Sequence, residues 1–237
     1  MRRTTTHGNR HYCIRWWCDV LPFGFLLESY GPLAILCLGA HADDIEIGAG
    51  GTILTLLERH PGSRVLWVVF SAKEHREAEA RGSATAMLGK AANAEVAIHQ
   101  FRDGFFPSDW ARIKQTFEGL KPFAPNVILT HYKADHHQDH RIISELTWNT
   151  FRDHLVFEYE VLKYDPDLGN PNLFVSLSQE KAETKLEVLW NYFTSQRQKR
   201  WFTSENFMAM MRVRGAQAAS PSGLAEGFYV SKCVLHG

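Results

Sequence analysis

The chain has 237 residues, of which 45% are hydrophobic and 22% are charged, an ordinary composition for a globular protein with one buried core. Its 26 basic residues are balanced by 26 acidic residues, so no overall charge attracts the protein to nucleic acid or to an anionic membrane. We therefore expect a small or neutral molecule as its partner.

The first 30 residues are interpreted as an N-terminal extension, followed by a single domain over residues 31–237. The extension is rich in aromatic residues, but polar residues and a proline interrupt it, so it predicts neither a signal peptide nor a membrane span. The interruptions are Arg15, Asp19, Pro22 and Glu28. Because contiguous apolar surface usually contacts a partner, we expect the extension to pack on the domain or on a second subunit.

Cysteine usage favours a reducing compartment. The four cysteines form no CxxC pair, and two of them lie inside apolar runs that are typical of buried, reduced thiols. Since no signal peptide is predicted either, we expect a cytoplasmic protein without disulfides.

Apolar, β-branched segments alternate with helical patterns along the chain. Strands are predicted over residues 33–39, 64–72, 94–101, 126–132 and 157–164, and helices near residues 50–60, 74–90, 109–121 and 139–154. This alternation predicts an α/β fold, a Rossmann-like three-layer α/β/α sandwich with a mostly parallel sheet. From residue 165 the pattern is less regular, and a last strand is expected over residues 225–235.

The first polar cluster follows the first predicted strand, in LGAHADDIEIGAGG (residues 38–51). His41, Asp43 and Asp44 occupy the turn after that strand, and ligands of open α/β sheets bind at the carboxyl ends of strands. The two adjacent carboxylates repel each other. A bound cation, a hydrogen-bonding shell or exposure to solvent can each offset that repulsion.

The glycines of the same motif are similar to those of a nucleotide-binding loop. However, Gly48, Gly50 and Gly51 do not have the GxGxxG spacing, and no GK[ST] sequence indicates a phosphate-binding loop. We favour a structural role, in which the glycines let the first helix pack close to the sheet and let the loop turn tightly.

The second polar cluster, THYKADHHQDHR (residues 130–141), begins at the end of the fourth predicted strand. Its histidines and aspartates are His131, Asp135, His136, His137, Asp139 and His140. Two such clusters at the carboxyl ends of strands in one sheet predict a shared site. Imidazole and carboxylate ligands without cysteine suit Zn²⁺, or another divalent ion such as Fe²⁺ or Co²⁺, held by three protein ligands with one position open.

These motifs resemble those of the PIG-L/LmbE-like superfamily of zinc-dependent N-deacetylases, usually written [PA]HPDD and HPDH. Here AHADD and HQDH have Ala42 and Gln138 in place of proline, which removes no metal-binding or titrating side chain. Further resemblance lies in REAEARGSATAMLG, FRDGFFP, KLEVLWNYFTSQ and RGAQAASPSGLAEGF, so about residues 33–230 are covered. The resemblance implies a hydrolase that removes an acetyl group from an N-acetylglucosamine-type sugar in a glycoconjugate, antibiotic or thiol-cofactor pathway.

The resemblance also implies roles for the matching residues. His41, Asp44 and His140 would bind the metal ion, and Asp43 would act as the general base on the water that the ion acidifies. The two adjacent aspartates would then tolerate each other, because the cation neutralises one carboxylate while the other accepts a proton.

The resemblance further implies that His137 faces the developing oxyanion and can donate a proton, with Asp139 behind it to fix its tautomer. Three other residues, Arg76, Glu79 and Asp103, would hydrogen-bond sugar hydroxyls. His131 and His136 match no catalytic position of the family.

Two other readings remain open. The chain can be a Rossmann-like module that binds a sugar or a nucleotide without catalysis, or an amidase that acts on a non-sugar amide. The complete set of titrating residues argues against a vestigial site. The identity of the aglycone stays undetermined, because loops such as 103–110 and 165–180 select the substrate in folds of this kind.

Overall fold

The computed structural model describes residues 31–234, so the extension expected over residues 1–30 lies outside the described residues. A seven-stranded sheet comprises β1 (Ala34–His41), β2 (Arg64–Ser71), β3 (Asn93–Ile98), β4 (Val127–His131), β5 (Leu155–Tyr159), β6 (Leu173–Ser176) and β7 (Ala225–Tyr229). The α-helices of this range are α2 (Asp44–Arg59), α3 (His75–Met87), α4 (Trp110–Leu120), α5 (Gln138–Thr150), α6 (Gln179–Tyr192) and α7 (Ser204–Gln217). Three short 3₁₀ helices are η1 (Phe106–Asp109), η2 (Lys121–Phe123) and η3 (Thr194–Gln196).

The strand order is β3-β2-β1-β4-β5-β7-β6. The first five strands of this order are parallel, and β7 pairs antiparallel with both β5 and β6. The predicted α/β fold with a mostly parallel sheet is therefore confirmed. Strand β6 was not predicted, and the last strand ends at Tyr229, six residues earlier than expected.

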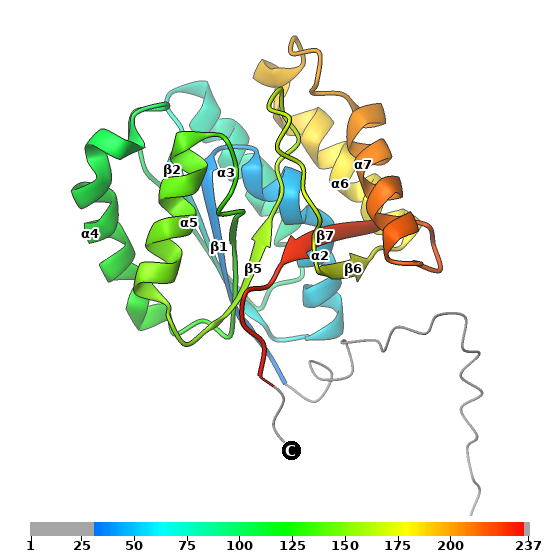
Figure 1. The fold of residues 1–237 in the computed structure, drawn as a ribbon, viewed down its shortest axis with the longest axis horizontal. Helices are drawn as coiled ribbons and strands as arrows, with labels where there is room; N and C mark the ends of the chain where they lie inside the picture. Colours follow the sequence, from blue (N-terminus) through cyan, green and yellow to red (C-terminus); the bar gives the residue numbers. More distant parts are fainter. Residues whose placement is uncertain (1–30, 235–237) are drawn as a thin grey trace, which may run out of the picture.

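Helices cover both faces of the sheet, which gives three layers (Figure 1). On one face, Leu36 and Leu38 of β1 pack with side chains of α4 and α5. On the other face, Ile35 and Cys37 pack with side chains of α2, α3, α6 and α7. Because side chains alternate along a strand and both faces are covered, β1 is apolar along nearly its whole length.

The glycines of α2 allow the helix to approach the sheet closely. A Cβ atom on Gly48 would lie 2.1 Å from Cδ2 of Tyr159, and one on Gly51 would lie 2.6 Å from Cδ1 of Leu177. The helix begins at Asp44, so these glycines lie inside it and not in the preceding turn. The close packing expected from the sequence is confirmed, whereas the expected role in the turn is wrong.

The strand order reverses direction between β1 and β4. These two strands are neighbours, but the chain runs from β1 toward β2 and β3 on one side and from β4 toward β5 on the other. At such a reversal of strand order the loops diverge and leave room for a ligand at the carboxyl ends of the strands. Both polar clusters of the sequence lie at this point.

The described cysteines are free thiols, with Cys37 in the core and Cys233 exposed. Burial raises the pKa of the Cys37 thiol well above its usual range, so Cys37 stays protonated and unreactive in the folded protein. Between residues 31 and 234, no helix has the length and apolar character needed to cross a membrane.

Glu46 in α2 is a fully buried carboxyl group. One of its oxygens accepts a hydrogen bond from Ser83, and Oε2 has no hydrogen-bond partner among the described residues. Burial raises the pKa of Glu46 from 4.5 to about 8, so the group is protonated at neutral pH.

We predict that Glu46→Gln weakens the pH dependence of stability. Because the pKa of Glu46 is higher in the folded than in the unfolded state, Glu46 contributes its full stabilisation below pH 4.5. This contribution is lost as the pH rises through about 8. Relative to the variant, the wild type should therefore lose about 3 kcal/mol of unfolding free energy between pH 6 and pH 9. Urea unfolding of both proteins at the two pH values measures this difference. An equal change in unfolding free energy in the wild type and the variant would contradict the prediction.

Candidate metal centre and active site

The site is built at the ends of β1 and β4 and at the starts of the helices that follow. His41 is the last residue of β1, and Asp44 is the first residue of α2. His140 lies in the first turn of α5, after the loop that leaves β4. The Asp44 carboxylate accepts a hydrogen bond from the backbone N–H of His41 at 2.6 Å, which turns it back toward the end of β1.

Three donor atoms from these residues converge. His41 Nδ1 lies 3.4 Å from Asp44 Oδ2 and 3.3 Å from His140 Nε2, and the last two atoms are 3.5 Å apart. In a tetrahedral Zn²⁺ site with bonds of about 2.0–2.2 Å, neighbouring ligand atoms are about 3.3–3.6 Å apart. The three atoms therefore match one face of such a tetrahedron, and this donor set fits a divalent ion with a fourth position left open.

The charges around these atoms also favour a cation. Burial acts to raise the pKa of Asp44, but the three surrounding imidazoles lower it well below its usual range, so Asp44 is ionised. Burial, assisted by neighbouring His131, lowers the pKa of His140 to about 3, so this ring is neutral and has a lone pair for a metal ion. Burial acts to lower the pKa of His41, but nearby carboxylates raise it well above its usual value.

Carboxylates on the far sides of the two rings determine which nitrogen faces the centre. Asp135 Oδ2 lies 2.9 Å from His140 Nδ1, and Lys163 Nζ donates to the same oxygen at 3.0 Å. Asp139 Oδ2 lies 3.2 Å from His41 Nε2. Each carboxylate accepts the N–H on the far side of its ring, so the other nitrogen faces the centre; that of His140 is unprotonated, and that of His41 would bind a metal ion by giving up its proton.

The position of Asp139 corrects one expectation. Its carboxylate contacts His41, whereas we expected it to fix the tautomer of His137. The backbone N–H groups of Gly104 and Phe106 donate to its two oxygens at 2.6 Å and 3.1 Å. These bonds hold the carboxylate beside the loop before η1, on the side of His41.

We predict that Asp139→Asn weakens metal binding. The amide cannot accept hydrogen bonds at both terminal atoms, so it loses either a backbone N–H or the ring N–H of His41. Loss of such a supporting contact typically lowers metal affinity about 10–100-fold. Competition with a chelator of known affinity measures the change, and an affinity equal to the wild type would contradict the role of Asp139.

His137 precedes α5 and is the N-cap residue of that helix. Its Nδ1 accepts a hydrogen bond from the backbone N–H of Asp139 at 3.2 Å, so the proton of the neutral ring is on Nε2. Burial, together with the charge of His41, lowers the pKa of His137. The ring centroids of His137 and His41 are 4.8 Å apart, so His137 presents a neutral N–H donor beside the centre.

Asp43 and the residues of α3 form a second part of the site. Asp43 Oδ1 accepts a hydrogen bond from Nη2 of Arg76 at 2.7 Å. Glu79 was expected to bind sugar hydroxyls, but it is buried and its two oxygens accept hydrogen bonds from Thr194 and Ser195. Its carboxylate is therefore occupied by the protein itself.

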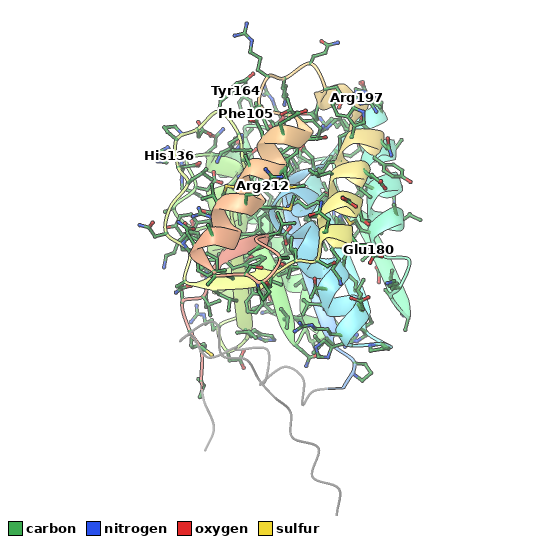
Figure 2. All side chains as sticks on the ribbon, turned by 90° about the vertical axis from the view of Figure 1, so that its right-hand side faces the viewer. Phe105, His136, Tyr164, Glu180, Arg197 and Arg212 are labelled. Carbon is green, nitrogen blue, oxygen red and sulfur yellow. The ribbon has the colours of Figure 1, made fainter. Side chains whose placement is uncertain are left out.

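Asp103 lies on the solvent side of the centre. Its Oδ1 is 3.1 Å from His41 Nε2, yet its side chain is 74% exposed. Figure 2 shows Phe105, His136 and Tyr164, which lie in loops, near one end of the molecule. Asp103 is thus available to a bound ligand.

The two histidines that matched no family position have different surroundings. His131 is fully buried, and its Nε2 lies 3.2 Å from Asp44 Oδ2. The same nitrogen accepts a hydrogen bond from the backbone N–H of Ala40 at 2.9 Å, so its lone pair is already used. His136 is exposed; its backbone N–H donates to Asp167, and its backbone carbonyl accepts a hydrogen bond from Arg141.

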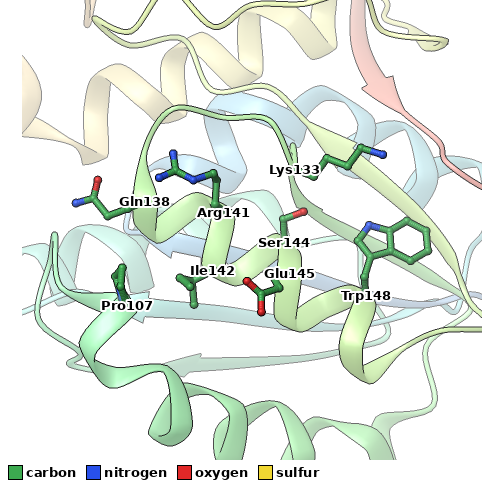
Figure 3. A pocket seen from close by; sticks show the side chains of 8 residues that line it. All are labelled: Pro107, Lys133, Gln138, Arg141, Ile142, Ser144, Glu145 and Trp148. Atoms are coloured by element: carbon green, nitrogen blue, oxygen red, sulfur yellow. The ribbon is translucent and has the colours of Figure 1, made fainter.

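A groove of about 390 Å³ runs along α5 beside the site (Figure 3). It is lined by Pro107, Lys133, Gln138, Arg141, Ile142, Ser144, Glu145 and Trp148. None of the three converging donor atoms belongs to its lining. Gln138 connects the two regions, since its side chain donates to the backbone carbonyl of Gly104 at 3.1 Å.

Sequence reasoning missed Lys163 and Ser195. Lys163 lies in the loop after β5 and contacts Asp135, and Ser195 lies in η3 and contacts Arg76. Lys163 falls inside the strand predicted over residues 157–164, and Ser195 lies in the less regular part after residue 165. For Ser195 the sequence held a signal, because the stretch that contains it belongs to the family resemblance, although no role was attached to it.

Three solved structures have a similar fold. The conserved protein TT1542 from Thermus thermophilus has a TM-score of 0.67 at 22% identity, covering 86% of this chain and 97% of that one. N,N'-diacetylchitobiose deacetylase from Pyrococcus horikoshii has a TM-score of 0.62 at 18% identity, covering 83% and 82%. GalB, the 4-carboxy-2-hydroxymuconate hydratase from Pseudomonas putida, has a TM-score of 0.69 at 17% identity, covering 86% and 98%. Because a deacetylase and a hydratase both occur among them, the fold alone does not decide the reaction.

The family match is more specific. Residues 36–151 match the family described as PIG-L, GlcNAc-PI de-N-acetylase. This segment runs from β1 to the end of α5 and contains both polar clusters, including the three converging donor atoms. The predicted resemblance to this family is therefore confirmed over residues 36–151.

Proposed function

We propose that this protein is a metal-dependent hydrolase that removes the acetyl group from an N-acetylglucosamine-type sugar, releasing acetate and a free amine. The observation that carries the proposal is the triangle of donor atoms from His41, Asp44 and His140, with distances of 3.3–3.5 Å, next to Asp43. The match to a family described as a de-N-acetylase supports the same reaction.

His41, Asp44 and His140 would hold the ion, for which we propose Zn²⁺ because the donors are two imidazoles and one carboxylate. When bound, such an ion polarises the amide carbonyl and acidifies water at neutral pH. Asp135 and Asp139 keep the two rings in the tautomers that face the centre.

Asp43 would act as the general base. It takes a proton from the water that attacks the acetyl carbon, and it returns that proton to the sugar nitrogen as the C–N bond breaks. His137 would donate its Nε2–H to the oxyanion that develops on the carbonyl oxygen, a role for which a neutral ring suffices. The products are acetate and the amine, so the atoms of amide and water are all accounted for.

Asp103 and Arg76 would contact the sugar. The exposed carboxylate of Asp103 faces the opening beside His41 and can accept hydrogen bonds from sugar hydroxyls. Glu79 does not take this role, because both of its oxygens already accept hydrogen bonds from η3.

The test is the release of acetate from a panel of N-acetylated compounds. The panel contains N-acetylglucosaminides with neutral, anionic and lipid aglycones, together with N-acetylated amines that carry no sugar. We expect equal amounts of acetate and free amine from the glucosaminides. Cleavage of the non-sugar amides alone would indicate a different amidase, and binding of a sugar without turnover would indicate a binding module.

A further inference from the structure

The contact between Arg76 and Asp43 is one end of a longer hydrogen-bond network. The side chain of Arg76 is 19% exposed and that of Asp43 is 7% exposed, so their 2.7 Å contact is largely shielded from water. A charge-assisted bond of this length restrains a carboxylate strongly. Among the residues that the structure describes, no group donates a hydrogen bond to Oδ2 of Asp43.

Ser195 holds the other end of the Arg76 guanidinium. The Ser195 hydroxyl accepts hydrogen bonds from Nη1 of Arg76 at 3.2 Å and from Nε2 of Gln196 at 2.9 Å. The same hydroxyl donates to Oε2 of Glu79 at 2.7 Å. One donor and two acceptor positions are therefore all used, which leaves the hydroxyl a single orientation.

Glu79 in turn fixes η3 to α3. Its Oε1 accepts hydrogen bonds from the backbone N–H of Ser195 at 2.8 Å and from the Thr194 hydroxyl at 3.0 Å. Glu79 lies three residues after Arg76, so both side chains project from the same face of the helix. The network thus joins α3 to η3, two segments that are more than 100 residues apart in the sequence.

We infer that Glu79 and Ser195 are positioning residues that hold Arg76, so that Arg76 orients Asp43 with one carboxylate oxygen free to accept a proton. This inference rests on the proposed function, in which Asp43 is the general base. A flexible arginine would let the carboxylate rotate, and a misplaced catalytic group loses rate even when the substrate still binds. Neither positioning residue needs to touch the substrate for this effect.

The experiment combines substitutions of the two positioning residues with Asp43→Asn. Ser195→Ala and Glu79→Gln should each lower kcat about 10–100-fold, with KM within about threefold of the wild type. In the Asp43→Asn background, the same substitutions should lower the residual rate by less than about twofold, because they act through Asp43. Ser195→Ala removes one hydroxyl and serves as the second variant if Glu79→Gln does not fold.

Glu77→Gln is the matched control, since Glu77 lies on the same helix and pairs with Arg81 at the surface. Its kcat and KM should equal those of the wild type. A raised KM with unchanged kcat in the Ser195 and Glu79 variants would show that the network binds substrate, and additive losses in the Asp43→Asn background would show that it acts elsewhere. Either result overturns the inference alone, whereas a wild type that releases no acetate overturns the proposed function and the inference together.

Discussion

Asp43→Asn should lower kcat by about 10²–10⁴-fold while the metal ion stays bound. The amide has nearly the same shape as the carboxylate but cannot accept the proton of the attacking water, and general-base catalysis usually contributes a factor of this size. Metal binding should persist, because the converging donor atoms come from His41, Asp44 and His140. Steady-state kinetics together with metal analysis by mass spectrometry measure both quantities.

Asp44→Asn is the matched control for this prediction, because it changes the neighbouring aspartate in the same way. It should lose both metal and activity, since Asp44 supplies one of the three donor atoms. If Asp43→Asn keeps near-wild-type turnover with the metal in place, the proton goes to another group and the proposed mechanism is wrong.

His137→Ala should lower kcat by about 10²–10³-fold, the usual effect of losing one donor to an oxyanion. The neutral Nε2–H of His137 is the donor that faces the centre, since Nδ1 is bonded to the start of α5. The substitution also removes an N-cap, which costs about 1 kcal/mol of stability. Thermal unfolding separates this structural loss from the catalytic one.

His137→Asn refines the same test. Asparagine is a favoured N-cap residue, so this variant should recover the stability that alanine loses. Its shorter side chain does not reach as far as the imidazole Nε2, and kcat should stay low. Recovery of kcat together with stability would mean that His137 acts only through the N-terminus of α5.

The parallel half of the fold was predictable because apolar segments alternate with helical patterns there as far as β5. The edge of the sheet was not predictable in this way. Strand β6 has only four residues, most of them half-buried, so its sequence carries little apolar signal. Its place in the sheet comes from pairing with β7, a contact between segments about 50 residues apart.

The residues of the site were predictable, but the orientation of their side chains was not. The spacing of His41 and Asp44 around a strand end indicated that both approach one point. The direction of Asp139 depends on two backbone N–H groups of a loop more than 30 residues earlier. Likewise, the Glu79 carboxylate accepts hydrogen bonds from η3, a segment more than 100 residues later in the chain.

We propose that His41, Asp44 and His140 hold a divalent ion that the chain needs to hydrolyse an N-acetylated sugar. The most direct measurement is acetate release from an N-acetylglucosaminide by the purified protein, by the protein after dialysis against a strong chelator, and after Zn²⁺ is restored. We expect about one divalent ion per chain before dialysis, loss of acetate release when the ion is removed, and recovery at one equivalent of Zn²⁺. Full activity in protein shown to contain no metal would contradict this proposal.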